Sequence, residues 1–503
     1  IAVGMAAGYA AARRYRKDSD TPPLGVVNLH ALGGLAHGLG NLYGAARSNV
    51  PLLVTAGAQA TNFRHKEPIL TGDMVGLTDE FTKFSQEVLD AEALPVLLRR
   101  AVRTALSPPM GPVFLSLPLD VMEQPLPQSP LPLGDLPEAG SCPDDKLTQL
   151  KHQLTNAESP IFVLGDSLGR GGHQAVSNFV DVIETTGSMA FGEILAAECN
   201  FPTSHPQWMS FLPPDADLVS ELLDTDLVIL VGCSSNAPLF RDGSSLIPES
   251  TTCVQIHSDP LELGKNERTD LTLYGDFTRI GTKLADSMEG ETAEEVRENR
   301  LKVGEDVSAL IDARFQDYLE NDPKPDRCSK PDVVEVLEAE VNDFFLVDEG
   351  VTGRYALLQE WPMEPEKYLS NKGGSLGYGL PASIGVSLAL DRDDNARVLA
   401  YVGDGSFWYY PQSLYTAARR NLPITFLVLN NRGYSILKDK LKEFYDHTSS
   451  SPGMDLRDIS SPEAAQSQGI ESRTVNDKEG LREALQSQKD LSNPGLIEVL
   501  VHD

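Results

Sequence analysis

The fold of this chain is decided by residues 397–434, which read RVLAYVGDGSFWYYPQSLYTAARRNLPITFLVLNNRGY. Residues 398–402 and 424–429 are apolar, β-branched runs of the kind found in buried strands. Between them, Pro411 suits a first helical turn, and Pro423 prevents the helix from continuing into the second run. A strand, a helix and a second strand form a βαβ unit, whose parallel strands end at the same edge of one sheet. The sequence therefore predicts an α/β fold built on a parallel sheet.

Polar side chains and glycines follow both of these strands. Asp404 lies in a Gly-Asp-Gly-Ser turn after the first strand, and Asn431 follows the second strand. Carboxylate and amide oxygens suit Mg²⁺, while the backbone N–H groups of Gly405 and Ser406, near a helix start, suit a diphosphate. Each turn alone would be an ordinary loop. Together, 27 positions apart (431 minus 404) and at corresponding strand ends, they favour a metal–diphosphate site.

The composition indicates a large, acidic, multidomain protein. A chain of 503 residues with 41% hydrophobic content is too long for one core and indicates about three domains. The 42 basic and 73 acidic residues give a net charge of −31, which excludes nucleic acid and anionic membranes as partners. Such acidity keeps proteins soluble at high salt, so we expect a halophilic source. Five dispersed cysteines indicate free thiols in a reducing cytoplasm.

Apolar runs alternate with helical segments along the whole chain, which predicts three doubly wound parallel-sheet domains at residues 1–135, 145–325 and 331–503. The proline-rich residues 125–137 are expected to form an extended linker. The charged residues 282–330 are expected to form a surface helix pair and a second linker. Strands are predicted at residues 25–29, 51–56, 111–117, 160–164, 226–231, 252–257, 344–347, 398–402, 424–429 and 495–501.

The Gly-Asp-Gly turn, helix, apolar strand and Asn-Asn pair resemble the diphosphate and metal motif of thiamine diphosphate enzymes. Within that superfamily the chain resembles benzoylformate decarboxylase and other 2-oxo acid decarboxylases, from VGMAAGYA near its start to GLIEVLV near its end. The resemblance implies thiamine diphosphate and Mg²⁺ as cofactors, and non-oxidative decarboxylation of a 2-oxo acid to an aldehyde. It also implies pyrimidine-binding, central and diphosphate-binding domains, in a homodimer or homotetramer with active sites at the dimer interface.

The resemblance assigns roles to particular residues. It implies that the side chains of Asp404 and Asn431 and the backbone carbonyl of Gly433 bind Mg²⁺. The carbonyl of Gly374 would accept a hydrogen bond from the aminopyrimidine, and Leu376 would hold the cofactor bent. Further cofactor contacts are implied for Thr352, whose hydroxyl would bind the terminal phosphate, and for Gly405, Ser406 and Tyr434.

Two further residues concern catalysis and substrate choice. His30 ends a predicted strand, and a histidine there can shuttle protons near neutral pH. The Asn-Leu-His context matches the decarboxylases, and the alternative is a histidine that merely caps a turn. Ile436 stands where the benzoylformate enzyme has a smaller residue, so we expect a pocket suited to a short 2-oxo acid.

Two expected residues have no match in the chain. Enzymes of this type place a glutamate against the pyrimidine ring, and we expect it just upstream of Ile1. The resemblance also implies a second active-site histidine near Pro238 and Leu239, where this chain has none.

A carboligase of the acetolactate synthase type is an alternative function, although those enzymes usually show a Gly-Pro-Gly turn where this chain reads NLHALGGLAHG, and often bind FAD. A non-catalytic protein that binds thiamine diphosphate is the other alternative.

Overall fold

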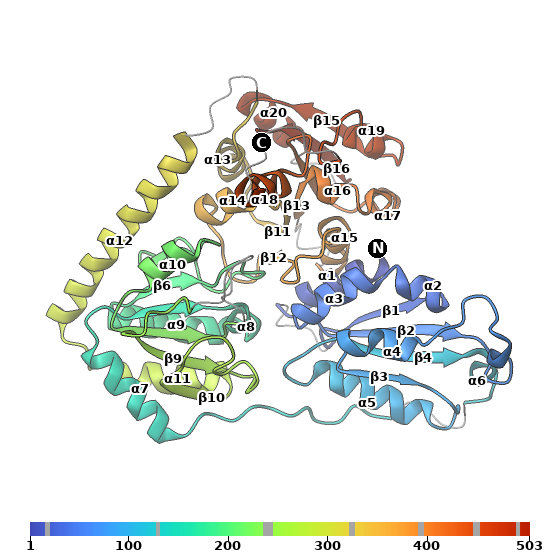
Figure 1. Cartoon of the computed structure of the whole chain (residues 1–503), viewed down its shortest axis with the longest axis horizontal. Coiled ribbons are helices and arrows are strands. Elements are labelled where there is room, and N and C mark those ends of the chain that lie inside the picture. The colour runs from blue at the N-terminus through green and yellow to red at the C-terminus, as the bar shows by residue number, and fades with distance from the viewer. Residues whose placement is uncertain are drawn as a thin grey trace.

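Three parallel β-sheets organise the chain, and each lies in its own lobe (Figure 1). The computed structural model describes residues 1–15, 21–126, 131–234, 245–320, 327–390, 397–445, 453–488 and 493–502. The strand orders are β1-β2-β4-β3, β10-β9-β8-β5-β6-β7 and β12-β11-β13-β14-β16-β15. Every paired strand runs parallel to its neighbour, and helices pack on the sheets, so the predicted fold class is confirmed.

The first lobe carries the edge strand that ends at His30. Its strands are β1 (Gly25–Leu29), β2 (Leu52–Ala58), β3 (Phe84–Glu87) and β4 (Val113–Pro118). Its helices are α1 (Ala2–Arg13), α2 (Ala31–Ala36), α3 (Leu39–Arg47), α4 (Met74–Thr78), α5 (Leu94–Leu106) and α6 (Leu119–Met122). The sequence predicted β1, β2 and β4. It missed β3, because Phe-Ser-Gln-Glu is only half-buried and has no apolar run.

The second lobe contains the longest helix. Its strands are β5 (Ile161–Leu164), β6 (Met189–Gly192), β7 (Trp208–Phe211), β8 (Leu227–Val231), β9 (Thr252–His257) and β10 (Leu271–Tyr274). Its helices are α7 (Asp144–Asn156), α8 (Asp166–Arg170), α9 (His173–Thr186), α10 (Ala216–Leu222), α11 (Phe277–Met288) and α12 (Glu294–Glu320). The expected surface helix pair within residues 282–330 is wrong, because α12 is one continuous helix. Buried Arg300 holds α12 in place, since its guanidinium donates to the carbonyls of Thr186, Leu154 and Ala157.

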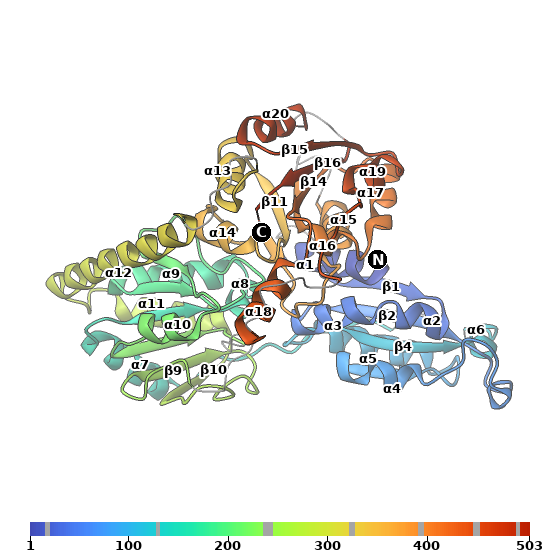
Figure 2. The ribbon, with the colours of Figure 1, turned by 45° about the horizontal axis from the view of Figure 1, so that its top comes forward.

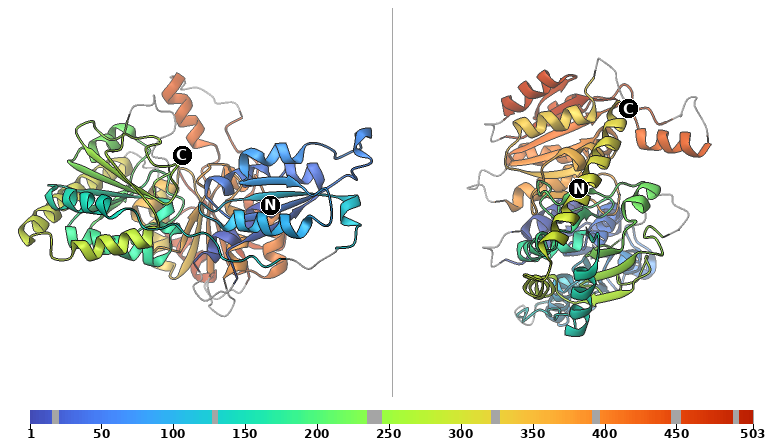
Figure 3. Two further views of the ribbon diagram at one scale, coloured as in Figure 1. Left: turned by 90° about the horizontal axis from the view of Figure 1, so that it is seen from below. Right: turned by 90° about the vertical axis from the view of Figure 1, so that its left-hand side faces the viewer.

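The third lobe contains the two strands predicted at residues 398–402 and 424–429. Its strands are β11 (Phe344–Glu349), β12 (Tyr368–Ser370), β13 (Arg397–Gly403), β14 (Ile424–Asn430), β15 (Glu471–Val475) and β16 (Gly495–Leu500). Its helices are α13 (Lys330–Glu340), α14 (Arg354–Glu360), α15 (Gly379–Ala389), α16 (Asp404–Phe407), α17 (Leu414–Arg420), α18 (Ser435–Tyr445), α19 (Ser461–Gln466) and α20 (Lys478–Gln488). The helix predicted near Pro411 begins as a 3₁₀ turn and continues as α17. Helix α18 projects from the body of the molecule in both views of Figure 3.

Helices α1 and α15 join the first and third lobes (Figure 2). Their backbones touch because glycines line the crossing. A Cβ atom on Gly8 would lie 2.2 Å from the carbonyl oxygen of Ala382, and one on Gly385 would lie 1.9 Å from that of Met5. Real Cβ atoms do not approach so closely, so these positions require glycine. The crossing holds α15, and the loop that precedes it, against the first lobe.

Several expectations concern segments without regular structure. Residues 131–143 form neither helix nor strand, as the linker prediction requires. Residues 127–130 and the positions of Pro238 and Leu239 lie outside the described residues.

In the part of the chain that the structure describes, no helix is both long and apolar enough to cross a bilayer. All five cysteines are free thiols. The boundaries of the three domains stay a prediction.

The crossing of α1 and α15 gives a first testable prediction. Gly385→Ala places a methyl group against the backbone of α1, so we expect it to lower the free energy of unfolding by about 1–3 kcal/mol. Urea denaturation measures this change. Gly140→Ala is the matched control, because a Cβ there meets no atom within 4 Å. Equal urea midpoints for Gly385→Ala and the unaltered chain would contradict the assigned packing.

Candidate active site

The ends of β13 and β14 lie side by side at the carboxyl edge of the third sheet. Gly403 pairs with Leu429 in parallel register, and the two polar turns follow directly. The backbone N–H of Gly433 donates to Asp404 Oδ2 at 3.2 Å and to Asn431 Oδ1 at 3.1 Å. The carboxylate and the amide oxygen therefore converge on one point, as the sequence predicts.

The Asn431 amide is held in this orientation. Its Nδ2 donates to the hydroxyl of Ser435, at the start of α18, and this leaves Oδ1 directed toward Gly433. Only 9% of Asn431 is exposed. The amide oxygen is thus fixed beside the Asp404 carboxylate before any ligand binds, which reduces the entropic cost of forming a metal site.

Asp404 is a buried carboxylate whose ionised form is costly. Burial raises the pKa of Asp404 to about 6, although the N–H groups of Gly405 (2.8 Å) and Gly433 favour the charged form. A divalent cation beside the carboxylate would reverse this shift. The buried carboxylate is therefore stabilised either by a proton or by a cation beside it.

A narrow cavity opens at these strand ends and brings most of the predicted residues together. Thr352, Leu376, Asp404, Gly405, Ser406, Asn431, Gly433, Tyr434 and Ile436 all line it. The ring of Tyr434 packs on Gly405, where a Cβ atom would lie 2.7 Å from the ring. The sequence missed Lys330, which reaches this cavity from the start of α13.

The donor set of this cavity fits Mg²⁺ and a diphosphate. The hydroxyl of Ser406 is buried and has no hydrogen-bond partner, so it can donate to an anion. Thr352 adds a second hydroxyl to the wall. Across the described residues, no three His, Cys, Asp or Glu side chains form a metal cluster. One carboxylate with amide and backbone oxygens instead matches the hard ligands that Mg²⁺ accepts when phosphates complete its shell.

The loop between β12 and α15 carries Gly374 and Leu376. Gly374 has a φ of +67°, which glycine adopts without strain, and it lies outside the cavity that Leu376 lines. The carboxylate of Glu349 fixes the end of this loop by accepting from the N–H groups of Gly377 (2.6 Å), Tyr378 (3.1 Å) and Gly379 (2.7 Å). Burial raises the pKa of Glu349 to about 7. The sequence analysis missed Glu349, although an acid at the end of a strand was a visible signal.

A buried ion-pair network ties the same loop to the second lobe. Lys372 Nζ lies 2.9 Å from Glu193 Oε1 and 3.2 Å from Asp166 Oδ2. Arg170 then joins Asp166 to Glu198, at 3.4 and 2.6 Å. Arg14 of the first lobe reaches Glu198 at 3.0 Å. The loop that carries Gly374 and Leu376 is therefore tied to an ion-pair network with members from all three lobes.

His30 does not meet the other predicted site residues. It is exposed at the end of β1, where it precedes α2. No described residue of the first lobe lines the cavity beside Asp404. Within one chain, His30 therefore lies outside the cavity that brings the other predicted residues together.

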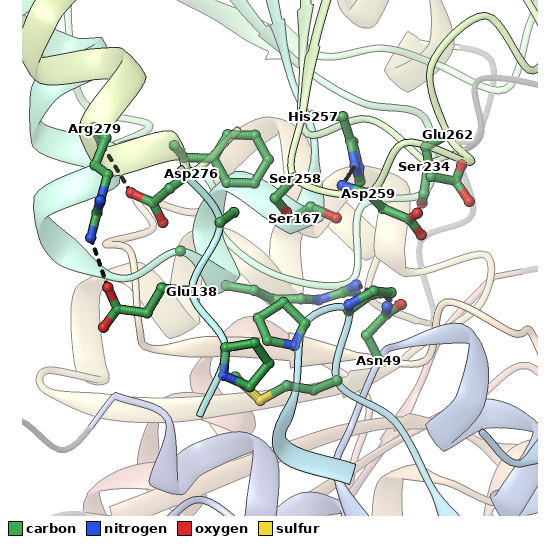
Figure 4. A pocket seen from close by; sticks show the side chains of 18 of the residues that line it. Asn49, Glu138, Ser167, Ser234, His257, Ser258, Asp259, Glu262, Asp276 and Arg279 are labelled. Carbon is green, nitrogen blue, oxygen red and sulfur yellow. Dashed lines mark hydrogen bonds and ion pairs between the residues drawn. The ribbon is translucent and has the colours of Figure 1, made fainter. Parts of the chain in front are cut away.

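A larger cavity of ≈440 Å³ lies between the first and second lobes (Figure 4). Figure 4 shows Ser167, Ser258 and Asp259 on its wall, and Arg279 bound to Glu138 at 2.7 Å on one side. Burial lowers the pKa of His257, another wall residue, to about 4. This cavity contains none of the residues predicted to bind a cofactor, so its size does not make it the candidate active site.

Three family models match the chain in order. The N-terminal, central and C-terminal domains of thiamine pyrophosphate (that is, thiamine diphosphate) enzymes match residues 1–93, 147–284 and 350–499. Benzoylformate decarboxylase of Pseudomonas aeruginosa is 31% identical, over 99% of this chain and 89% of the relative. Acetolactate synthase isozyme 3 large subunit of Escherichia coli is 25% identical, over 87% of this chain and 75% of that relative.

Solved structures show the same fold. The benzoylformate decarboxylase of Polynucleobacter necessarius aligns with a TM-score of 0.84 and 24% identity, over 99% of this chain and 90% of that chain. A putative thiamin diphosphate-dependent enzyme from Mycobacterium smegmatis aligns with a TM-score of 0.83 and 26% identity, over 100% and 90%. The likeness therefore extends over all three lobes.

The raised pKa of Asp404 gives a second prediction. Mg²⁺ requires the ionised carboxylate, so below pH 6 the proton competes with the metal. We expect the Mg²⁺-dependent affinity for thiamine diphosphate to fall about fivefold from pH 6 to pH 5 and to be nearly constant above pH 7. Calorimetric titration across this range measures it. Asp404→Asn cannot titrate and serves as the control for protonation of the ligand phosphate. The same slope in both proteins would exclude Asp404 as the metal ligand.

Proposed function

The chain belongs to the thiamine diphosphate-dependent decarboxylases related to benzoylformate decarboxylase, and we propose that it converts a 2-oxo acid to an aldehyde and CO₂, with Mg²⁺ as second cofactor. The observation that carries this proposal is the convergence of the Asp404 carboxylate and the Asn431 amide oxygen on one N–H group. Neither oxygen alone would specify a metal. Together, at the mouth of a cavity with buried hydroxyls, they provide a metal site beside an anion site.

The proposed roles follow from the chemistry of each side chain. Asp404, Asn431 and the Gly433 carbonyl hold Mg²⁺. The hydroxyls of Thr352 and Ser406, with the backbone N–H of Gly405, bind the diphosphate. When the cofactor binds, the carbonyl of Gly374 would accept a hydrogen bond from the aminopyrimidine and Leu376 would support the cofactor by apolar contact. Tyr434 packs on Gly405 in the wall of the cavity. Thiamine diphosphate, when bound, supplies the electron sink for the bond that breaks as CO₂ leaves.

His30 is the proposed proton carrier. Its exposure at the carboxyl edge of the first sheet leaves the ring available to a group outside its own lobe. Because His30 does not line the Asp404 cavity of its own chain, the proposal includes a second copy of the chain. Each active site would combine the first lobe of one copy with the third lobe of the other, in a homodimer or homotetramer.

The substrate is proposed to be a short 2-oxo acid. Ile436, at the start of α18, lines the cavity beside the apolar side chains of Leu429 and Val501. A β-branched side chain at this position leaves little room for an aromatic substituent. Small substrates such as pyruvate would fit better than benzoylformate.

Product analysis tests the proposed reaction. With thiamine diphosphate, Mg²⁺ and pyruvate, we expect acetaldehyde and CO₂, because the proposed site includes a proton donor. Acetolactate as the main product would instead identify a carboligase, which the similarity to acetolactate synthases keeps as the competing function. Calorimetric binding of the cofactor without CO₂ release from any 2-oxo acid in a panel would identify a non-catalytic binding protein.

Substrate size gives a separate prediction. Ile436→Ala removes three carbon atoms from the cavity wall, so we expect kcat/KM for benzoylformate relative to pyruvate to rise by about tenfold or more. Competition between the two acids, followed by product chromatography, measures the ratio. Leu437→Ala is the control, since Leu437 is the next residue of α18 and is 48% exposed. An unchanged ratio in Ile436→Ala would remove Ile436 from the substrate pocket.

A further inference from the structure

The loop of residues 371–378, between β12 and α15, lies where all three lobes meet, and we call it the junction loop. From it, the side chain of Lys372 reaches the second lobe. On the other side the loop packs on α3 of the first lobe, where a Cβ atom on Gly44 would lie 2.9 Å from Asn371 Oδ1. The position of the junction loop therefore depends on two lobes besides its own.

Hydrogen bonds make the first half of the junction loop a single unit. Asn371 Oδ1 accepts from the N–H of Gly373 at 2.9 Å, and Asn371 Nδ2 donates to the carbonyl of Ser375 at 2.5 Å. The N–H of Gly374 donates to the carbonyl of Asn371 at 3.3 Å. A contact that holds Lys372 therefore also holds Gly374.

Lys372 joins the junction loop to two carboxylates that the second lobe holds rigidly. Its side chain is only 7% exposed, and those of Asp166 and Glu193 are fully buried. Glu193 accepts from the N–H groups of Asp166 (2.7 Å) and Ser234 (3.2 Å). Asp166 accepts from the N–H of Ala197 at 2.8 Å. The ammonium of Lys372 thus binds an anchor that is fixed by the backbone of the second lobe.

The ion pair keeps Lys372 charged. Burial alone would lower the pKa of Lys372, but the carboxylates of Asp166 and Glu193 outweigh this effect and raise it. A buried ion pair is screened by water and salt far less than a pair on the surface. The contact can therefore hold the loop in one position.

The other end of the junction loop is fixed by its own lobe. Glu349, the last residue of β11, accepts from three consecutive N–H groups there. Gly374 and Leu376 lie between this anchor and Lys372. Loss of the Lys372 ion pair would thus loosen one side of the loop and leave the start of α15 in place.

We propose that Lys372 is a positioning residue, through which the second lobe holds Gly374 and Leu376 where the rings of the cofactor bind. This inference rests on the proposed function, because thiamine diphosphate supplies the rings that these two residues contact. No described residue of the second lobe lines the Asp404 cavity, yet that lobe contributes to cofactor affinity. Without the ion pair, the loop must be ordered when the cofactor binds, and this ordering costs affinity.

Titration calorimetry with two ligands, each in the presence of Mg²⁺, tests the proposal. In Lys372→Met we expect the affinity for thiamine diphosphate to fall about tenfold. Inorganic diphosphate has no rings, so its affinity should stay within about twofold, because Asp404 and Asn431 are unaltered. Lys367→Met is the matched control. Lys367 pairs with Asp343 at 2.6 Å and has a half-exposed side chain, so both affinities should stay unchanged in this variant.

A double variant separates positioning from stability. Lys372→Met leaves the buried carboxylate of Glu193 without its cation, which destabilises the fold, whereas Asp166 keeps Arg170 as a partner at 3.4 Å. Adding Glu193→Gln removes the uncompensated charge. We expect the melting temperature of Lys372→Met/Glu193→Gln to return close to that of the unaltered chain, while its affinity for thiamine diphosphate stays about tenfold low. This variant takes the place of Lys372→Met should the single variant not fold.

Three results would overturn the proposal: unaltered thiamine diphosphate affinity in a folded Lys372 variant, an equal loss for the two ligands, or recovery of affinity together with stability in the double variant. An equal loss in Lys367→Met would overturn it too. Failure of the unaltered chain to bind thiamine diphosphate would instead reject the proposed function, and this inference with it.

Discussion

The register between β13 and β14 is the constraint on which the site depends. Because Gly403 pairs with Leu429, the turns after both strands reach the same level at one edge of the sheet. The N–H of Gly433 can then bind Asp404 and Asn431 at once. A slip of one residue would turn alternate side chains to the opposite face and separate these oxygens. The almost fully buried apolar residues of both strands prevent such a slip.

The site retains buried charge at a cost to the folded state. Burial raises the pKa of Asp404 to about 6 and that of Glu349 to about 7. The folded protein therefore binds these protons more tightly than the unfolded chain does. The resulting stabilisation is full at low pH and is lost as pH rises through the folded pKa values. A cation bound at Asp404 would reverse the effect there, while Glu349 is held by three N–H groups of the loop before α15.

The sequence could predict those features of the fold and the site that depend on residues close together in the chain. The apolar runs of β13 and β14, and the polar turns after them, specified both the parallel fold and the convergence of Asp404 with Asn431. Edge strands such as β3 and β15 escaped notice because their residues are largely polar or exposed. Lys330 could not be assigned, because it reaches the cavity only through the pairing of its neighbour Cys328 with Val501.

The same limit applies to contacts between lobes. Lys372 belongs to a glycine-rich loop to which the family resemblance assigned cofactor contacts. Its partners Asp166 and Glu193 belong to the second lobe and meet it only when the second and third lobes pack together. His30 was expected at a carboxyl edge and lies at one. It does not line the cavity beside Asp404 in the same chain.

The central claim is that two neighbouring strand tips share one divalent ion. The most direct measurement is a crystal structure of the chain with thiamine diphosphate and Mn²⁺ in place of Mg²⁺, with the metal located by anomalous scattering. The account predicts one strong peak between the Asp404 carboxylate and the Asn431 amide oxygen, in contact with the diphosphate. A cofactor-bound structure in which these side chains point apart and the metal lies elsewhere would contradict it.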